Sequence, residues 1–221
     1  MQKWETLDRA REGNSGELVL ARRGDEYVIR CDGQVLMSSR QHGSERSLAE
    51  LGIQAARGRA RIFIGGLGMG FTLRAALDLL PASSEVVVCE LSAAIAKWNR
   101  EYLGCLTNLS LDDGRVTLLI EDAALHLTKA KSAYDAILLD IDNGPRALVR
   151  DGNDRLYGLG GIARCFAALK PGGALAVWSA APDPDYLKRL GEAGFLARAE
   201  SVSARGPSGG QRHVIFLGVR P

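Results

Sequence analysis

The sequence predicts an α/β protein with a doubly wound, mostly parallel seven-stranded sheet, a C-terminal antiparallel hairpin and a small N-terminal β meander. From Arg61 onward, short apolar runs alternate with helix-length segments, a pattern typical of parallel strands joined by crossover helices. Ahead of Arg61, short segments of alternating polarity are separated by turn residues. Near the C-terminus, Gly206-Pro207-Ser208-Gly209-Gly210 separates two apolar segments, and such flexible residues suit a hairpin.

The alternating pattern of the N-terminal part predicts three short antiparallel strands. They span Glu17–Arg23, Glu26–Cys31 and Gln34–Ser38, with Arg-Gly-Asp and Asp-Gly turns between them. A helix is expected to follow as far as Arg57, with Ser44 or a nearby carboxylate accepting hydrogen bonds from its first amides.

The chain length limits the number of domains. A protein of 221 residues accommodates one α/β domain and a small addition, but hardly two full domains. We therefore expect the meander to form an appendage over residues 1–43 and a single domain to cover residues 44–221.

The parallel strands are predicted where apolar runs are flanked by helix-length segments. A sheet of this kind is covered on both faces, because each crossover places a helix against it. The expected strands lie at residues 61–64, 85–89, 116–120, 136–139 and 174–178, and those of the hairpin at 197–204 and 212–219.

A glycine-rich loop follows the first parallel strand. Gly65, Gly66, Gly68 and Gly70 precede a helix-forming segment, and glycines allow a sharp turn and a close approach of the backbone to a ligand. Phe71 stands where a third glycine would complete a dinucleotide fingerprint, so NAD fits poorly. The loop by itself favours ligand binding over mere packing, and together with Glu90 at the end of the second strand it predicts a nucleoside.

Three acidic residues follow successive strands. Glu90 lies about 20 residues beyond the loop, where a carboxylate can accept both ribose hydroxyls. The carboxylate of Asp122 and the amide of Ala123 can read an adenine edge, and Asp140 follows the fourth strand. Ligands of open parallel sheets bind beyond the carboxyl ends of the strands, so these residues should meet in one crevice.

Composition excludes several other classes of protein. The formal charge of +2 gives no strong field, so a nucleic-acid partner is not expected. No segment is long and apolar enough to span a membrane, and the N-terminus lacks the apolar run of a signal peptide. The cysteines, Cys31, Cys89, Cys105 and Cys165, are scattered without a CxxC pair. We expect a cytoplasmic protein with no metal, in which His126 and His213 are structural.

With its glycine loop and the acids at its strand ends, the sequence resembles the spermidine synthase family, within the larger Rossmann-like methyltransferase group. The resemblance extends from the meander to the hairpin and rests on the loop 65–70, Glu90, the segments 121–123 and 134–140, and Leu169-Lys170-Pro171-Gly172-Gly173. It implies that Glu90 binds ribose, that Asp122 binds adenine and that Asp140 is the catalytic acid or base.

Some positions depart from the family pattern. The family usually has an acid at the position of Gly68. After the fourth strand it usually has two acids three residues apart, whereas Asp140 and Asp142 are two apart. Before the glycine loop it usually has a Tyr-His-Glu cluster, and residues 42–45 of this chain, His-Gly-Ser-Glu, lack the Tyr. Asp142 is either a contact for a cationic acceptor or part of an Asx turn. His42 and Tyr157 are candidate acceptor contacts.

The leading hypothesis is transfer of an aminopropyl group from decarboxylated S-adenosylmethionine to a small amine. Methyl transfer from S-adenosylmethionine to a small acceptor is the second hypothesis. A catalytically silent nucleoside-binding subunit is the third, and retention of Asp140 favours the two catalytic ones. The resemblance also implies a homodimer formed with help from the N-terminal strands.

Overall fold

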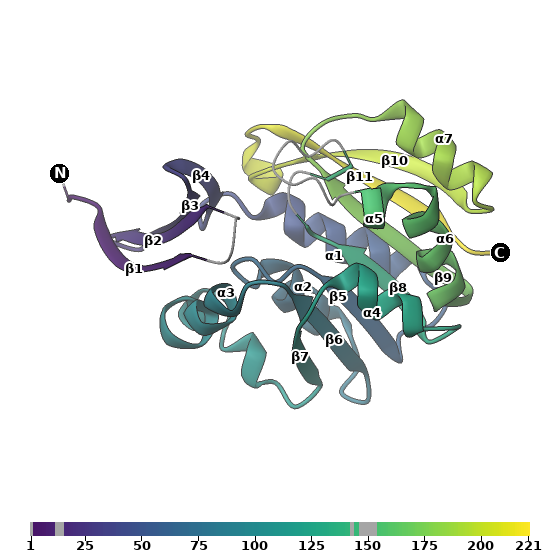
Figure 1. The fold of residues 1–221 in the computed structure, drawn as a ribbon, viewed down its shortest axis with the longest axis horizontal. Helices are drawn as coiled ribbons and strands as arrows, with labels where there is room; N and C mark the ends of the chain where they lie inside the picture. The colour runs from purple at the N-terminus through teal and green to yellow at the C-terminus, as the bar shows by residue number, and fades with distance from the viewer. Residues whose placement is uncertain (1, 12–15, 142–143, 146–153) are drawn as a thin grey trace.

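The computed structural model describes residues 2–11, 16–141, 144–145 and 154–221. Figure 1 shows a mixed sheet with helices on both faces and a smaller N-terminal sheet beside it. None of the described helices is long and apolar enough to cross a membrane.

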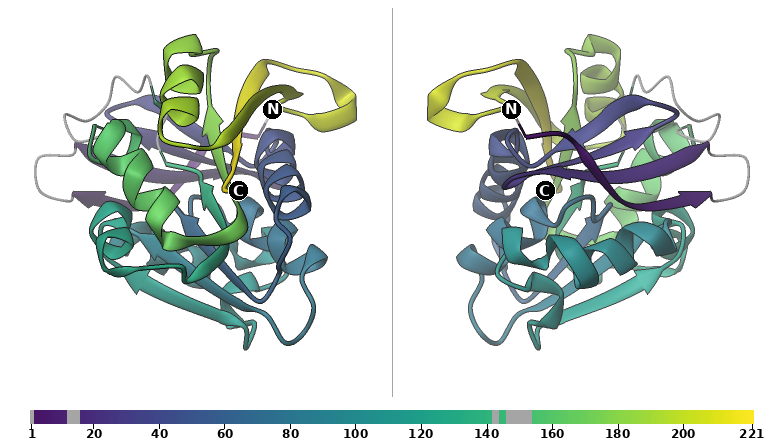
Figure 2. Two further views of the ribbon diagram at one scale, coloured as in Figure 1. Left: turned by 90° about the vertical axis from the view of Figure 1, so that its right-hand side faces the viewer. Right: turned by 90° about the vertical axis from the view of Figure 1, so that its left-hand side faces the viewer.

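The N-terminal sheet has four antiparallel strands in sequence order. They are β1 (Glu5–Arg11), β2 (Glu17–Arg23), β3 (Glu26–Cys31) and β4 (Gln34–Ser38). The last three match the predicted meander, whereas β1 was not predicted. It is an edge strand with mostly charged, exposed residues, so it lacks the apolar alternation that marks a strand in sequence. In the right-hand view of Figure 2 these strands lie in front of the rest of the chain.

The large sheet confirms the predicted doubly wound architecture. Its seven strands have the order β10-β11-β9-β8-β5-β6-β7, and β9, β8, β5, β6 and β7 are parallel to one another. The hairpin β10–β11 is antiparallel and closes one edge, with β11 paired to β9. The strands are β5 (Arg61–Gly65), β6 (Glu85–Glu90), β7 (Val116–Ile120), β8 (Tyr134–Leu139), β9 (Leu169–Ser179), β10 (Leu196–Ser203) and β11 (Arg212–Val219).

Strand β9 is longer than predicted. It begins at Leu169 and contains Lys170-Pro171-Gly172-Gly173, residues that normally interrupt a strand. The register against β8 shifts between Tyr134 and Ala136, and Gly172 has a φ of +77°. This irregular first part explains why the sequence indicated only the regular apolar run.

Helices cover both faces of the large sheet. One face packs on α1 (Gly43–Ala55), α2 (Phe71–Leu79) and α3 (Ala93–Trp98), and the other packs on α4 (Ala123–Lys129), α5 (Asp154–Tyr157), α6 (Leu159–Ala168) and α7 (Pro184–Glu192). Alternate residues of one strand enter the two cores: Ile62 and Ile64 of β5 face α1 and α2, whereas Phe63 faces α4. The described part of the chain also contains a π-helical turn, η1 (Asn99–Leu103), and the 3₁₀ turns η2 (Gly104–Leu106), η3 (Ser110–Asp112) and η4 (Gly206–Ser208).

Helix α1 begins differently from the prediction. Its N-cap is His42, which makes no side-chain capping bond, and Ser44 is already inside the helix. The Ser44 hydroxyl instead donates to Glu45 Oε2 at 2.7 Å and lies 2.9 Å from His213 Nδ1. The expected capping role of Ser44 is therefore wrong, because its side chain faces β11 rather than the free amides of the first turn.

Candidate active site at the carboxyl ends of the parallel strands

A cavity of about 210 Å³ lies at the carboxyl ends of the parallel strands. The ends of β6, β7 and β8 contribute acidic residues, and the loop after β5 contributes Gly66 and Gly68. Residues of the N-terminal sheet line the opposite side. The described residues of the lining are Leu18, Leu36, Met37, Gly66, Gly68, Cys89, Glu90, Leu91, Ser92, Ile95, Glu121, Asp122, Ala123, Ala124, Asp140, Ile141, Arg155 and Leu156.

The glycine loop turns sharply between β5 and α2. Gly66, Gly68 and Gly70 all have positive φ angles, of +89°, +53° and +83°. A Cβ atom at Gly66 would lie 2.1 Å from the carbonyl oxygen of Asp140, so only glycine fits there. Asn99 Nδ2 donates to the Gly68 carbonyl at 2.7 Å and fixes the far side of the loop.

Gly68 occupies the position at which the family resemblance implies an acid. A Cβ atom at this residue would lie 3.2 Å from the sulfur of Met37, which belongs to β4 of the N-terminal sheet. The Met37 side chain of the N-terminal sheet therefore lies next to the place where a side chain at residue 68 would project.

Glu90 is held against the glycine loop. Its Oε2 accepts from the Leu67 amide at 2.9 Å and its Oε1 accepts from the Ser92 amide at 2.8 Å. Burial raises the pKa of Glu90, while these amides act in the opposite direction. Backbone hydrogen bonds from Gly68 and Leu91 act on the carboxylate in the same direction. A carboxylate in the cavity wall is an acceptor that ribose hydroxyls can use.

Asp122 is the N-cap of α4 as well as a residue of the cavity wall. Its Oδ1 accepts from the Ala124 amide at 2.7 Å, which fixes the carboxylate at the entrance to the helix. Ala123, the next residue, also lines the cavity. An acceptor and a neighbouring backbone donor thus lie side by side, the arrangement that can read an adenine edge.

Asp140 follows β8 at the inner end of the cavity. Its amide donates to Gly65 at 2.8 Å, and its Oδ2 accepts from the Thr72 hydroxyl at 2.6 Å. Burial and the charge of Glu90 raise the pKa of Asp140 to about 6, against the effect of the Thr72 hydrogen bond. A carboxyl group with such a pKa can receive a proton near neutral pH.

Glu45 of α1 forms an electrostatic pair with Asp140 that sequence reasoning missed. Burial and the charge of Asp140 raise the pKa of Glu45 to about 7. The two residues are far apart in the sequence, where Glu45 has the pattern of an ordinary acidic residue in the first turn of a helix. Thr72 was missed for the same reason, since only the folded chain brings its hydroxyl to Asp140.

The structure describes two of the three candidate acceptor residues, His42 and Tyr157. His42 is exposed, stacks on Phe71 with 4.2 Å between ring centroids, and bonds to the Ser39 carbonyl. Tyr157 is 2% exposed and its hydroxyl donates to the Ile141 carbonyl at 3.0 Å. Neither is among the described lining residues, and Asp142 lies outside the residues that the structure describes. The structure therefore brings the glycine loop, Glu90, Asp122, Ala123 and Asp140 together in the lining of one cavity, and His42 and Tyr157 are not among the described residues of that lining.

Comparison with protein families gives a match to the spermine/spermidine synthase domain over residues 41–183. A polyamine aminopropyltransferase of Mycobacterium tuberculosis (strain H37Rv) is 28% identical over 172 residues, which cover 75% of this chain and 31% of that protein. Polyamine aminopropyltransferase 2 of Pseudomonas aeruginosa is 32% identical over 120 residues, covering 52% of this chain and 32% of that protein. The chain thus spans about a third of the length of these curated relatives.

Solved structures show the same fold. A spermidine synthase in complex with the transition-state analogue AdoDATO matches with a TM-score of 0.80 at 20% identity, over 98% of this chain and 74% of that one. Spermidine synthase from Thermotoga maritima matches with a TM-score of 0.77 at 19% identity, over 98% and 72% of the two chains.

Proposed function

The chain belongs to the spermine/spermidine synthase family, whose model matches residues 41–183, and from this premise we propose that it transfers an aminopropyl group from decarboxylated S-adenosylmethionine to a small amine. The observation that carries the proposal is the position of Asp140, a partly buried carboxyl with a raised pKa, beside the glycine loop and Glu90 at one end of the cavity.

In this proposal Glu90 accepts hydrogen bonds from the ribose hydroxyls, and Asp122 with Ala123 contacts the adenine. The fixed geometry of both carboxylates supports these assignments, since backbone amides already orient them before any ligand binds. The glycine loop supplies the close backbone approach that Gly66 permits.

The proposed reaction is a direct displacement at carbon. The lone pair of the acceptor nitrogen attacks the aminopropyl carbon attached to the sulfonium, the carbon–sulfur bond breaks, and its electron pair remains on sulfur as methylthioadenosine. Asp140 takes the proton that the acceptor nitrogen loses and orients its lone pair. The sulfonium is already an activated electrophile, so this step requires no metal.

The charges in the cavity favour the decarboxylated donor. Among the described lining residues, Glu90, Glu121, Asp122 and Asp140 are acidic and Arg155 is the one basic residue. A ligand carrying a sulfonium and an ammonium group but no carboxylate is attracted by this surface, whereas the carboxylate of S-adenosylmethionine is repelled. This contrast separates aminopropyl transfer from methyl transfer.

A cytoplasmic homodimer is proposed, with neither nucleic acid nor membrane as a partner, on the basis of the scattered cysteines, the small net charge and the family resemblance. Light scattering of the purified chain at several concentrations tests the dimer, and a monomeric mass throughout contradicts it.

Calorimetric titration tests the choice of donor. The protein is titrated with decarboxylated S-adenosylmethionine, S-adenosylmethionine and methylthioadenosine under the same conditions. Tighter binding of the first and third ligands is expected. Preference for S-adenosylmethionine would favour methyl transfer, and no binding of any of them would reject the nucleoside site.

A further inference from the structure

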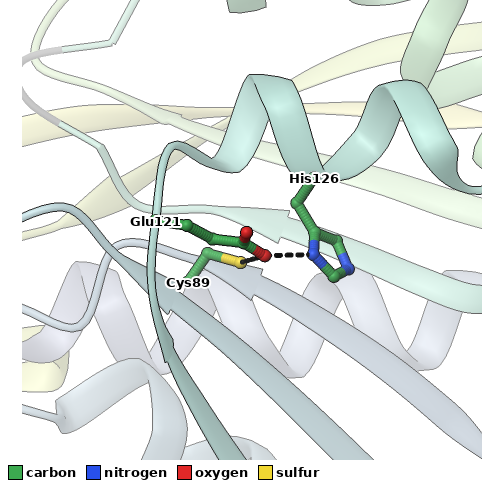
Figure 3. Close-up of side chains that lie close together, drawn as sticks. All are labelled: Cys89, Glu121 and His126. Carbon is green, nitrogen blue, oxygen red and sulfur yellow. Dashed lines mark hydrogen bonds and ion pairs between the residues drawn. The ribbon is translucent and has the colours of Figure 1, made fainter.

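A cluster of three possible metal ligands lies beside the cavity. Cys89 comes from the end of β6, Glu121 follows β7 and His126 belongs to α4. The cysteine sulfur, a Glu121 carboxylate oxygen and a His126 ring nitrogen all lie within 4.8 Å of one another. Figure 3 shows the three side chains pointing toward a common centre.

The His126 ring is held in place by contacts at both of its nitrogens and on one face. Its Nδ1 faces Glu121 Oε1 at 2.5 Å, and its Nε2 lies 2.7 Å from the Tyr134 hydroxyl. The ring also stacks on Phe63, with centroids 5.3 Å apart and planes inclined by 17°. A histidine that binds metal through one nitrogen characteristically hydrogen-bonds through the other, and Tyr134 provides that partner.

The ligand types select a particular class of ion. A thiolate, an imidazole and a carboxylate together suit a borderline divalent transition metal such as Zn²⁺, and unlike Mg²⁺ or Ca²⁺ this ion prefers sulfur and nitrogen. The ion's two positive charges balance one thiolate and one carboxylate. Binding displaces the thiol proton to solvent. The ring proton of His126 that faces Glu121 from Nδ1 is lost from that nitrogen, and the ring takes the tautomer with its proton on Nε2, so that Nδ1 binds the ion and Nε2–H donates to the Tyr134 hydroxyl.

The sulfur–oxygen distance is close to that of a tetrahedral site, whereas the nitrogen–oxygen contact is a hydrogen bond that must lengthen when an ion binds. Cys89 Sγ lies 3.9 Å from Glu121 Oε1. Tetrahedral zinc with ordinary bond lengths separates sulfur and oxygen ligands by about 3.5 Å, and nitrogen and oxygen ligands by about 3.3 Å. The Glu121 side chain is 35% exposed, so it can rotate away from His126 Nδ1 and toward the sulfur to admit the ion.

An ion can reach the cluster from the cavity. Cys89 and Glu121 both line the cavity, so a fourth coordination position faces it and is available to water. Glu90 and Asp122, the residues that follow Cys89 and Glu121, add negative potential that attracts a cation.

We propose that Cys89, Glu121 and His126 bind one zinc-class divalent ion that ties the ends of β6 and β7 together beside the nucleoside cavity. This inference goes beyond the proposed transfer reaction and does not depend on it. Two of the ligands directly precede Glu90 and Asp122, so a bound ion fixes the backbone from which both of these carboxylates project. The ion therefore has a positioning role and takes no part in the displacement.

Metal content and cobalt spectroscopy test the site in the full chain. The purified protein is stripped with a chelator, dialysed against limiting Zn²⁺ and analysed by mass spectrometry for bound metal. We expect one zinc per chain in the wild type and less than a tenth of that in Cys89→Ser. Cys105→Ser is the matched control, because Cys105 is an exposed cysteine outside the cluster, and it should bind zinc as the wild type does.

Cobalt substitution decides the question without relying on a variant that folds. Co²⁺ bound by the wild-type protein should give a thiolate-to-cobalt charge-transfer band and the intense visible absorption of tetrahedral coordination. Absence of the thiolate band in the wild type would overturn the proposal. The proposal would also be overturned if Cys89→Ser, shown by circular dichroism to be folded, bound zinc as the wild type does. Glu121→Gln, which keeps the size of the side chain, should weaken binding at least tenfold, and unchanged affinity in this variant would remove Glu121 from the site.

Discussion

Replacing Glu45 with glutamine should change how the stability of the protein depends on pH. Burial and the neighbouring Asp140 charge raise the pKa of Glu45 from 4.5 to about 7. The folded state therefore holds this proton more tightly than the unfolded chain does. The stability that follows from it is fully present below pH 4.5 and is lost as the pH rises through 7.

The size of the effect follows from the size of the pKa change. A rise from 4.5 to about 7 corresponds to a loss on the order of 3 kcal/mol in the free energy of unfolding between acidic and neutral pH. Glutamine does not ionise, and its side-chain oxygen can still accept the Ser44 hydrogen bond. Between pH 5 and pH 8, Glu45→Gln should therefore lose less stability than the wild type, by about 1–3 kcal/mol.

Urea unfolding at pH 5, 6, 7 and 8 and constant ionic strength measures this difference. Glu50→Gln is the matched control, because Glu50 lies on the same helix and faces Arg46 at 4.0 Å. The control should follow the pH dependence of the wild type. If wild type and Glu45→Gln lose stability in parallel, burial and the Asp140 charge do not raise the pKa of Glu45, and the electrostatic account of the site is wrong.

Three further predictions concern the proposed active site. Asp140→Asn should reduce turnover by about 10²- to 10⁴-fold, because it removes the proton acceptor, and calorimetry should show nearly unchanged binding of methylthioadenosine; unchanged turnover removes Asp140 from the mechanism. Glu90→Gln should weaken donor binding by about 1.5–3 kcal/mol, the contribution of a hydrogen bond to a charged group, and equal calorimetric affinities would argue against a ribose contact. Gly66→Ala should lower the urea midpoint, because its Cβ would lie 2.1 Å from the Asp140 carbonyl at a φ of +89°, and a midpoint equal to that of the wild type would show that the loop is not fixed as described.

The repeated pattern of the chain was sufficient to predict the large sheet. Buried parallel strands require continuous apolar runs, and the run that became β8 is buried along its whole length. Strand β1 escaped prediction because an exposed edge strand needs no apolar face. The start of β9 was not predicted, because Pro171 and Gly172 interrupt the pattern that marks a strand.

The candidate site was predictable where it depends on strand ends. Glu90 ends β6, Asp122 and Asp140 follow β7 and β8, and the carboxyl ends of parallel strands meet at one edge. Contacts between distant elements were not predictable, since nothing in the sequence places Glu45 of α1 beside Asp140. The cluster of Cys89, Glu121 and His126 was hidden for the same reason, because its members come from separate elements and have no metal-binding spacing.

The most direct test of the proposed function is identification of the reaction products. The purified chain is incubated with decarboxylated S-adenosylmethionine and a set of short diamines, and the mixture is analysed by mass spectrometry. Equal amounts of methylthioadenosine and an amine enlarged by one aminopropyl group are expected from the wild type, with little of either from Asp140→Asn. If neither product forms, and S-adenosylmethionine instead yields a methylated acceptor and S-adenosylhomocysteine, the chain is a methyltransferase and the assignment of aminopropyl transfer is wrong.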